Sequence, residues 1–367
     1  MSQKEYDYLI VGAGLFGSVF AYEATKRGKT CLVIDKKDHI GGTCYTENVH
    51  GINVHKYGAH IFRTDSKEIW EYVNQFAEFN RFTNCPVAVY KDKLYNLPFN
   101  MNTFYQLWGV KTPQEAMDKI DEQRVMNQHP LNLEERVLDL VGTDVYEKLV
   151  KGYTEKQWGQ KCTELSPDII SRIPLRFTFD NNYFYDRFQG VPIGGYTNLF
   201  EQLLSGSKVI LGVDFFEHFD LLTSLARKTV YTGMVDRLFD YKYGKLPYRS
   251  LIFEEEVYEE ESIQGNAVMN FTEYEVPYTR QIEHKHFEST CSLYTVITKE
   301  YPAKYEEGMT PYYPVKNDAS EKMYAQYRAL AEDYGIILGG SIATYEDLTM
   351  AETIESALKA ITKEFGE

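Results

Sequence analysis

Hydrophobic and polar positions along this chain first follow the pattern of a strand, then of a helix, then of a second strand. The apolar run Tyr8–Val11 predicts a buried strand, and it leads directly into the glycine-rich segment Gly12–Gly17. A helix and a second strand ending at Asp35 are expected to follow. This opening β-α-β unit ends near Gly42, and His55–Phe62 predicts a further strand or turn close to it.

The next part of the chain changes to a helical pattern. A helix is expected from Lys67 to Phe79, and from Asn102 to about Ser171 the apolar positions follow helical spacing. Pro113 stands at a helix start, and Leu133–Leu140 carries apolar residues at i, i+4 and i+5. The segment therefore predicts a helical domain.

Short runs of aromatic and β-branched residues dominate between about Arg176 and Glu300, separated by Gly, Pro and Asn. Such runs are typical of strands joined by turns, so we expect an antiparallel sheet here. Three of these runs are Val209–Leu211, Thr229–Tyr231 and Ser292–Ile297.

The end of the chain returns to α/β character. Tyr334–Leu338 predicts a strand, Gly339-Gly340 a turn, and Met350–Phe365 a helix. The return implies that the first domain is discontinuous and that the last helix completes it. The expected fold class is therefore α/β, with a discontinuous Rossmann-like domain, an inserted helical domain and an antiparallel β-sheet domain.

The glycine segment is the first candidate for chemistry. A strand that feeds a helix through G-x-G-x-x-G lets backbone N–H groups approach a pyrophosphate at the positive end of the helix. The acid about 20 residues later reaches the ribose hydroxyls, and Asp35 stands at that place. The pattern alone also fits a tight turn with close helix packing, but the strand and helix around it favour a dinucleotide site.

A second glycine pair, Gly41-Gly42, follows shortly after the acid. This arrangement resembles the extended fingerprint of flavoproteins of the glutathione-reductase and amine-oxidase type, which implies FAD as the cofactor. A plain loop at this pair is the alternative. The candidate cofactor-binding residues are Gly12, Gly14, Leu15, Phe16, Gly17, Asp35, Lys36, Gly41, Gly42, Thr43, His60, Ile61 and Gly340.

Composition narrows the class of protein further. A chain of 367 residues with 43% hydrophobic residues suggests two or three packed units. The net charge of −15 argues against a nucleic-acid partner. Five scattered cysteines fit free thiols in a reducing compartment, and no apolar run approaches the length of a membrane span. We therefore expect a cytoplasmic protein without a membrane partner.

Longer motifs then point to one family. The segments Gly152–Gly159, Arg172–Pro174 and Arg176–Phe184 closely resemble bacterial UDP-galactopyranose mutases. Further runs of the same resemblance are Asn96–Met101, Gln189-Gly190, Pro192, Gly194–Tyr196, Tyr248–Leu251, Pro277–Arg280 and Glu283–Phe287. The likeness covers nearly the whole chain up to about Pro314.

The resemblance implies an FAD enzyme that interconverts UDP-galactopyranose and UDP-galactofuranose with no net redox change. In that family the flavin must be reduced, and its N5 forms an adduct with the sugar while UDP departs. The resemblance further implies a reductant such as NAD(P)H, a homodimer, and a role in making galactofuranose for cell-surface polysaccharides in a bacterial cytoplasm.

The same resemblance assigns roles to individual residues. Arg172 and Arg280 match the diphosphate-binding arginines, and a guanidinium fork suits a departing diphosphate. His60 matches a histidine against the flavin, which would tune it rather than move protons. The implied substrate-binding residues are Tyr153, Thr154, Trp158, Tyr183, Asn84, Arg249, Asn270, Tyr313 and Tyr345. Without the resemblance, Arg172 would be a helix-end cation and Trp158 a core residue.

Domain boundaries follow from these assignments. We expect residues 1–80 to form the first part of the FAD-binding domain and 81–100 a sheet and substrate segment. Residues 101–172 form the helical domain with a mobile lid around Trp158, and 173–310 the antiparallel sheet with returning FAD-domain segments. Residues 311–367 complete the FAD-binding domain.

Two other patterns are assigned no chemistry. His284 and His286 are expected on one face of a strand, but nothing completes a metal site, so packing is the preferred interpretation and no metal is predicted. The acidic runs Glu254–Glu256 and Glu259–Glu261 fit a solvated hairpin edge that discourages strand pairing.

Four positions depart from the family pattern. Ser341 replaces an arginine expected near the FAD pyrophosphate, Asp347 a tyrosine expected at the substrate phosphates, and Thr349 an aspartate. Arg63 stands where the family usually has a second histidine. Losing a charged hydrogen bond costs about 1.5–3 kcal/mol. These changes keep open a weakly active paralogue, a mutase for UDP-N-acetylgalactosamine or another nucleotide sugar, and a flavin oxidoreductase of the amine-oxidase-like type.

Overall fold

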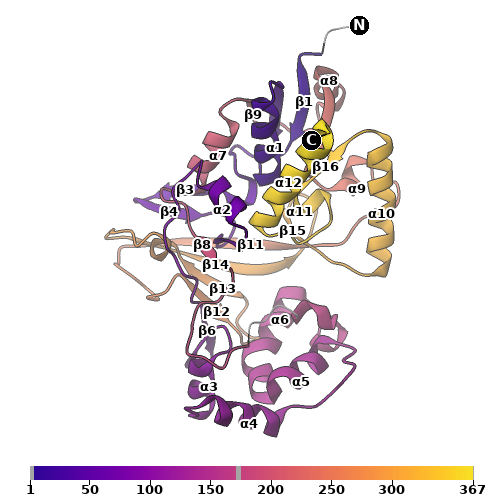
Figure 1. Ribbon diagram of the computed structural model, residues 1–367. Helices are drawn as coiled ribbons and strands as arrows, with labels where there is room; N and C mark the ends of the chain where they lie inside the picture. The colour runs from indigo at the N-terminus through magenta and orange to yellow at the C-terminus, as the bar shows by residue number, and fades with distance from the viewer. Residues whose placement is uncertain (1–3, 171–174, 367) are drawn as a thin grey trace.

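The computed structural model describes residues 4–170 and 175–366, and its upper layer in Figure 1 is a Rossmann-like unit. Five parallel strands form its sheet in the order β16-β10-β1-β2-β9. Their bounds are β1 Tyr6–Val11, β2 Cys31–Asp35, β9 Lys208–Leu211, β10 Ala226–Tyr231 and β16 Ile337–Leu338. The strands come from the start, the middle and the end of the chain, so this unit is discontinuous, as the sequence predicts.

Two of these strands correct the sequence prediction. The runs Val209–Leu211 and Thr229–Tyr231 belong to β9 and β10, which pair in parallel with β2 and β1, and not to the antiparallel sheet. Short apolar runs look alike in both kinds of sheet, and the strands that these two join lie about 180 to 220 residues earlier in the chain. Their partners therefore cannot be inferred from local pattern.

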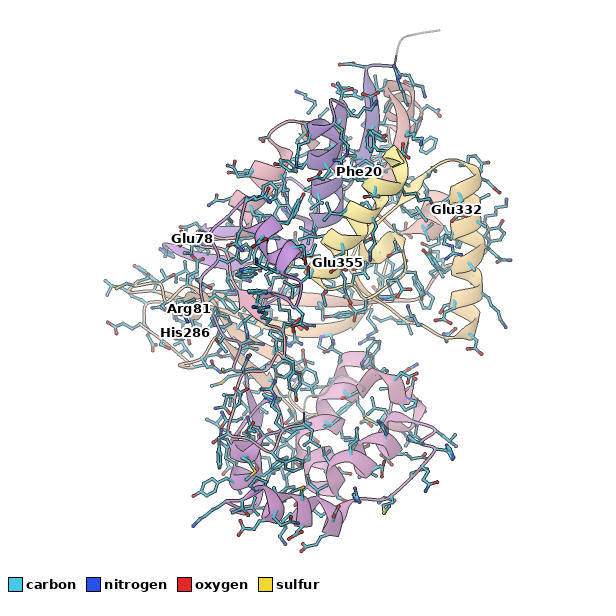
Figure 2. All side chains as sticks on the ribbon, in the orientation of Figure 1. Phe20, Glu78, Arg81, His286, Glu332 and Glu355 are labelled. Carbon is cyan, nitrogen blue, oxygen red and sulfur yellow. The ribbon has the colours of Figure 1, made fainter. Side chains whose placement is uncertain are left out.

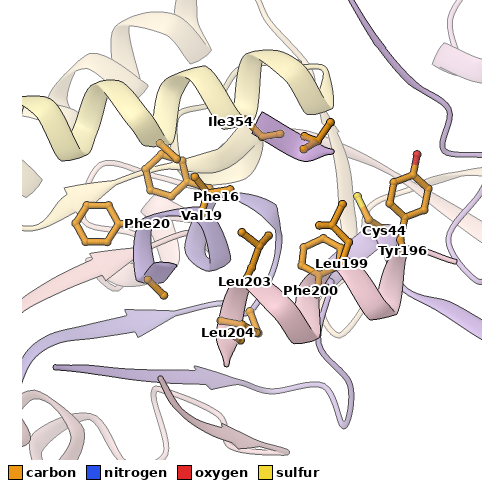
Figure 3. Packing of buried hydrophobic residues seen from close by; sticks show 14 of the residues in the cluster. Phe16, Val19, Phe20, Cys44, Tyr196, Leu199, Phe200, Leu203, Leu204 and Ile354 are labelled. Atoms are coloured by element: carbon orange, nitrogen blue, oxygen red, sulfur yellow. The ribbon is translucent and has the colours of Figure 1, made fainter. Parts of the chain in front are cut away.

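Helices cover both faces of the parallel sheet. On one face α1 (Leu15–Lys26) lies between α7 (Tyr196–Leu204) and α12 (Met350–Phe365), and Figure 3 shows Phe16 and Phe20 of α1 near Ile354 of α12. The C-terminal helix thus completes the N-terminal core, with the bounds that the sequence predicts. The remaining helices around this sheet are α2 Lys67–Val73, α8 Phe219–Leu225, α9 Val235–Leu238, α10 Asp318–Asp333 and α11 Gly340–Ala343.

A seven-stranded sheet forms the middle layer in Figure 1, in the order β15-β11-β14-β13-β12-β6-β7. Its strands are β6 Val87–Tyr90, β7 Lys93–Asn96, β11 Tyr248–Tyr258, β12 Val268–Phe271, β13 Arg280–Glu283, β14 Thr295–Lys304 and β15 Pro311–Pro314. All neighbours are antiparallel except β12 and β6. The exposed run Glu254–Glu256 lies on β11 beyond its pairing with β15, which confirms the solvated edge.

Two small sheets connect these layers. They are formed by β3 (Thr46–Val49) with β4 (Ile52–His55) and by β5 (Phe62–Thr64) with β8 (Phe188–Gly190). The segment between β4 and β5 is a loop, so His55–Phe62 contains a strand end, a turn and a strand start.

A helical lobe projects from the middle sheet, at the bottom of Figure 1. Its helices are α3 Met101–Trp108, α4 Pro113–Gln123, α5 Leu133–Val145 and α6 Lys151–Trp158, with a π-helical turn Tyr146–Val150 between the last two. The side chains of Asn100, Thr112 and Asn132 cap the first three helices by accepting backbone N–H groups. The predicted helical domain is therefore confirmed.

Three local predictions need correction. The helix expected from Lys67 to Phe79 ends at Val73 with Asn74 as its C-cap, and the residues after it pack Phe76, Ala77 and Phe79 against the Rossmann-like core. The strand expected over Tyr334–Leu338 is reduced to two residues, since α10 extends to Asp333 with Tyr334 as its C-cap. The predicted strand start at Ser292 moves to Thr295.

His284 and His286 are not on a strand. They lie in the 3-10 turn His284–Phe287, where His284 is buried beside Thr298 and His286, labelled in Figure 2, contacts Glu283. Within the described part of the chain, no group of three His, Cys, Asp or Glu side chains is arranged to hold a metal ion. Among residues 4–170 and 175–366, no helix combines the length and the apolar character that crossing a bilayer requires.

Candidate functional site

The glycine segment forms one wall of a cavity between the Rossmann-like sheet and the C-terminal helices, which we call the glycine-turn cavity. Gly12 has φ +111°, and a Cβ there would lie 2.0 Å from Thr232 Oγ1. A Cβ on Gly42 would lie 3.0 Å from the Cα of Gly14, so the two glycine turns touch through their backbones. The predicted cofactor residues that line this cavity are Gly12, Gly14, Leu15, Phe16, Gly17, Asp35, Gly41, Gly42, Thr43, His60, Ile61 and Gly340.

Asp35 is fixed at the end of β2. Its carboxylate accepts the backbone N–H of Ala13 at 2.8 Å and that of Lys37 at 2.9 Å. These bonds tie the first glycine turn to the second strand. Asp35 also lines a second cavity of about 440 Å³, the β2-side cavity, together with Lys36 and Arg237. All the predicted cofactor residues therefore border one of two adjoining cavities.

The loop that carries His60 is held from two sides. The backbone N–H of His60 donates to His55 Nδ1 at 3.1 Å, and the hydroxyl of Tyr196 donates to the backbone oxygen of His60 at 3.1 Å. The ring Nδ1 of His60 lies 2.8 Å from the oxygen of Gly58. Burial lowers the pKa of His60, so the ring is neutral. With Nδ1 directed at the oxygen of Gly58, the ring of a neutral His60 can accept a hydrogen bond through Nε2.

Arg280 lies where two further cavities meet. The first, the Arg280 cavity, shares Thr43, Ala59, His60 and Ser341 with the glycine-turn cavity and also contains Glu300, Tyr312 and Tyr313. The second, the α6 cavity, is bordered by Arg280, α6 and β12. Three openings thus follow one another from the glycine turn to the helical lobe.

Arg280 is placed by an acid and a phenol. Its Nε donates to the hydroxyl of Tyr153 at 3.0 Å, and its Nη1 lies 3.7 Å from Glu300 Oε1. Glu300 is 1% exposed, and burial raises its pKa. The side chain of Arg280 is 32% exposed, which leaves guanidinium donors for a ligand.

Three tyrosines surround this guanidinium. Tyr153 and Tyr183 line the α6 cavity, and Tyr313 lines the Arg280 cavity. Burial raises the pKa of each of the three phenols. They are therefore neutral at physiological pH, and a neutral hydroxyl can donate a hydrogen bond to an anionic group.

Unpartnered buried polar atoms gather in the same places. Among the described residues, nine buried side-chain polar atoms have no hydrogen-bond partner. Five of them belong to residues that line these cavities, namely Lys37 Nζ, Gln157 Oε1, Asn270 Oδ1, Glu300 Oε1 and Tyr312 OH. Buried polar groups are normally paired. The residues present thus fit a polar ligand that extends from the β2-side cavity to the α6 cavity.

The predicted substrate residues divide into those that line one of the cavities described above and those that do not. Thr154, Trp158 and Asn270 line the α6 cavity with Tyr153 and Tyr183. Three others lie elsewhere, namely Asn84, Arg249 and Tyr345. Arg172, the second predicted arginine, lies outside the described residues.

Tyr345 corrects the prediction. It is 1% exposed, and its single O–H lies between the backbone oxygens of Pro247 at 2.9 Å and Val315 at 2.8 Å, so it packs in the interior. Asn84 supports a site residue through its backbone, because its oxygen accepts the N–H of Tyr183. Arg249 donates to the backbone oxygen of Gln157 at 3.1 Å and so holds the end of α6. The last two therefore contact residues that line the α6 cavity.

The structure also shows what the four unusual residues do. Thr349 caps α12 by accepting the N–H of Glu352, a role that aspartate fills equally well. Arg63 pairs with Asp186 at 2.7 Å beside the ring of Phe184 and borders the glycine-turn cavity. Ser341 borders that cavity and the Arg280 cavity, and Asp347 borders the latter. The changes are therefore placed at the cavities themselves.

Sequence reasoning missed three residues of the site. Gln157 stands four residues after Tyr153 on α6, so helical spacing was a usable signal for it. Glu300 and Tyr312 lie on β14 and β15. Nothing in the sequence near either residue indicates that the strand on which it lies passes beside His60 and Arg280.

Comparisons with known proteins agree with this geometry. The family model for UDP-galactopyranose mutase matches residues 148–346, and that for an NAD(P)-binding Rossmann-like domain matches residues 10–76. A probable UDP-galactopyranose mutase of Klebsiella pneumoniae is 38% identical over 357 residues, which cover 96% of this chain and 92% of that protein. A dTDP-fucopyranose mutase of Escherichia coli is 35% identical over 371 residues, 96% of each chain.

One solved structure extends the comparison to the fold. The crystal structure of a reduced UDP-galactopyranose mutase matches with a TM-score of 0.75 at 13% identity, covering 98% of this chain and 96% of that chain. At this sequence identity, the match shows only that the two chains share a fold. It agrees with the predicted arrangement of a Rossmann-like unit, an antiparallel sheet and a helical lobe.

Proposed function

Because this chain belongs to the UDP-galactopyranose mutase family of isomerases, we propose that it interconverts UDP-galactopyranose and UDP-galactofuranose with FAD as its cofactor. One observation carries the proposal. The glycine-turn cavity and the Arg280 cavity share His60 among their lining residues, and the Arg280 cavity and the α6 cavity share Arg280. A dinucleotide in the first would therefore meet a nucleotide sugar that enters through the last.

Different residues would bind the cofactor and the substrate. The glycine turns and Asp35 would hold the pyrophosphate and ribose of the cofactor, as their backbone approach and fixed carboxylate allow. Arg280 would hold the diphosphate of the substrate, with hydroxyl donors from Tyr153, Tyr183 and Tyr313. Trp158 and Asn270 border the space left for the base. Arg172 is proposed as a second diphosphate ligand from the sequence resemblance alone.

The bound flavin would supply, in its reduced form, the nucleophile for the reaction. The protein's contribution is to hold the departing diphosphate and the sugar at the junction near His60. The fixed backbone and neutral ring of His60 support a role in orienting the cofactor. A diphosphate clamp has no use in an amine-oxidase-like oxidation, so the mutase is favoured over an oxidoreductase.

The test is a comparison of two redox states of the same preparation. Dithionite-reduced holoprotein is incubated with UDP-galactofuranose, and the pyranose is followed by chromatography beside an oxidised control. We expect turnover only in the reduced sample, without net consumption of reductant. Stoichiometric reduction of oxidised flavin by a substrate would instead indicate an oxidoreductase, and absence of turnover in both states would contradict the proposal.

A different nucleotide sugar is the second candidate. The similarity to a dTDP-fucopyranose mutase is nearly as high as that to the galactose enzyme, and Asp347 places a carboxylate in the Arg280 cavity. A carboxylate beside a diphosphate is repulsive, whereas it accepts hydrogen bonds from sugar hydroxyls. Assays with UDP-N-acetylgalactosamine and dTDP-fucose beside UDP-galactose separate these substrates by kcat/KM.

Replacing Asp347 with tyrosine tests whether this residue weakens diphosphate binding. We expect Asp347→Tyr to lower the Kd for UDP by about tenfold, because one repulsive charge is removed and one donor added. Isothermal titration of the oxidised holoprotein with UDP measures the change, and Glu346→Gln, at an exposed neighbour that pairs with Lys316, is the matched control. An unchanged affinity would show that Asp347 does not face the diphosphate.

The cellular setting is proposed from the family alone. A reductant such as NAD(P)H would keep the flavin active, and the enzyme would work as a homodimer in a bacterial cytoplasm. Its product would enter the synthesis of cell-surface polysaccharide.

A further inference from the structure

The two walls of the α6 cavity belong to segments far apart in the chain. Helix α6 contributes Tyr153, Gln157 and Trp158, whereas β12 and β13 contribute Asn270 and Arg280. The walls approach closely, since a Cβ on Gly152 would lie 2.3 Å from the backbone oxygen of Thr272. The position of the helix relative to the loop between β12 and β13 therefore sets the geometry of this cavity.

Lys156 joins the two walls. It is only 9% exposed although it lies on α6 between the cavity residues, and its ammonium points into the loop between β12 and β13. Its Nζ donates to three backbone oxygens, those of Phe271 at 2.7 Å, Val276 at 2.8 Å and Tyr278 at 2.9 Å. An ammonium has three N–H donors, so all of them are used on one loop.

In the chain, the three acceptors lie between the cavity residues Asn270 and Arg280. Phe271 follows Asn270 directly, and Tyr278 comes two residues before Arg280. We propose that Lys156 is a positioning residue, which fixes the loop 271–278 against α6 and so keeps Arg280 and Asn270 beside Tyr153 at the binding site of a nucleoside diphosphate. This inference rests on the proposed function for the identity of the ligand, but the tie itself rests on contacts alone.

The chain offers a matched control in Lys285. This lysine is 7% exposed and also donates its Nζ to three backbone oxygens, those of Glu261, Ser292 and Tyr294. It lies in the turn His284–Phe287 and borders none of the cavities described above. Lys285→Met removes a tie of the same kind from a place where no ligand is expected.

The experiment compares Lys156→Met with Lys285→Met in the full-length holoprotein. We expect Lys156→Met to raise the Kd for UDP and to lower kcat/KM, each by at least tenfold, because a displaced Arg280 would hold the diphosphate less well both when it is bound and when it departs. Lys285→Met should leave both values within twofold of the wild type, with a similar fall in melting temperature. Flavin absorbance should show full FAD content in both variants.

Equal losses of UDP affinity in the two variants would overturn the proposal, as would normal affinity in Lys156→Met. If Lys156→Met fails to fold, Lys156→Gln, which keeps two N–H donors, takes its place with the same criteria. If the wild-type chain binds no UDP, the proposed function is wrong. Amide hydrogen exchange would still test whether Lys156 holds the loop 271–278 against α6. Exchange in residues 272–278 should then accelerate at least tenfold in Lys156→Met and remain unchanged in Lys285→Met.

Discussion

Replacing Arg280 with alanine is expected to lower kcat/KM by about 10²–10³-fold while FAD remains bound. The guanidinium stands between the Arg280 cavity and the α6 cavity, where charge would build on a departing diphosphate. Its own partners, Tyr153 and Glu300, leave part of the fork available for a ligand. The rate of the reduced holoprotein and its flavin absorbance measure the two effects separately.

The control must account for Glu300. This carboxylate is 1% exposed, and removing Arg280 leaves it without its nearest cation, so a loss of stability could imitate a loss of catalysis. The double variant Arg280→Ala with Glu300→Gln removes both charges and should melt closer to the wild type while remaining inactive. Arg280→Lys, which keeps the charge but not the fork, should be intermediate. Normal turnover in Arg280→Ala would contradict the diphosphate clamp.

The parts of the fold that the sequence predicts best are those with local signals. Strand β1, the glycine turn, α1 and the acid of β2 follow one another within 35 residues, and α12 is bounded by a capping threonine and a terminal glycine. Local pattern places strands β9 and β10 in the wrong sheet, because the pairing that decides their class involves β1 and β2. Sheet membership is a property of distant contacts, which periodicity does not encode.

The functional site likewise contains residues that local motifs predict and residues whose place depends on distant contacts. The glycines, Asp35, His60 and Arg280 are predicted from motifs and from the family, and the structure places them around cavities that share lining residues. Glu300 was missed because a strand glutamate in an acidic chain gives no sign of burial. The family resemblance places Tyr345 at the substrate, whereas the structure buries its hydroxyl between the backbone oxygens of Pro247 and Val315. Motif matching identifies a residue, but only packing determines where its side chain points.

The departures from the family pattern are not all alike in consequence. Thr349 preserves the helix cap that an aspartate would provide, and it also borders the glycine-turn cavity. Ser341 and Asp347 border the Arg280 cavity, and Arg63 adds a cation paired with Asp186 at the glycine-turn cavity. The balance of charge around the ligand path is therefore specific to this chain. It is the physical reason to test several nucleotide sugars rather than one.

Two glycines of the first turn are expected to respond differently to the same substitution. A Cβ on Gly17 would lie 2.1 Å from the backbone oxygen of Gly12, so Gly17→Ala must push α1 away from β1. Overpacking of this kind costs about 1–3 kcal/mol. Gly14 has φ −81°, and the nearest atom to an added Cβ is the Cα of Gly42 at 3.8 Å, so Gly14→Ala introduces no strain.

The added methyl group of Gly14→Ala would nevertheless occupy the glycine-turn cavity, where the backbone must approach a pyrophosphate. We expect Gly14→Ala to keep the melting temperature of the apoprotein within 1 °C or so, and to raise the Kd for FAD at least tenfold. Gly17→Ala should lower the melting temperature by several degrees and also lose FAD. Fluorescence titration of the apoproteins with FAD, beside thermal melts, separates the two effects. If Gly14→Ala binds FAD as tightly as the wild type, the pyrophosphate does not lie on this turn, and the path from glycine turn to Arg280 loses its starting point.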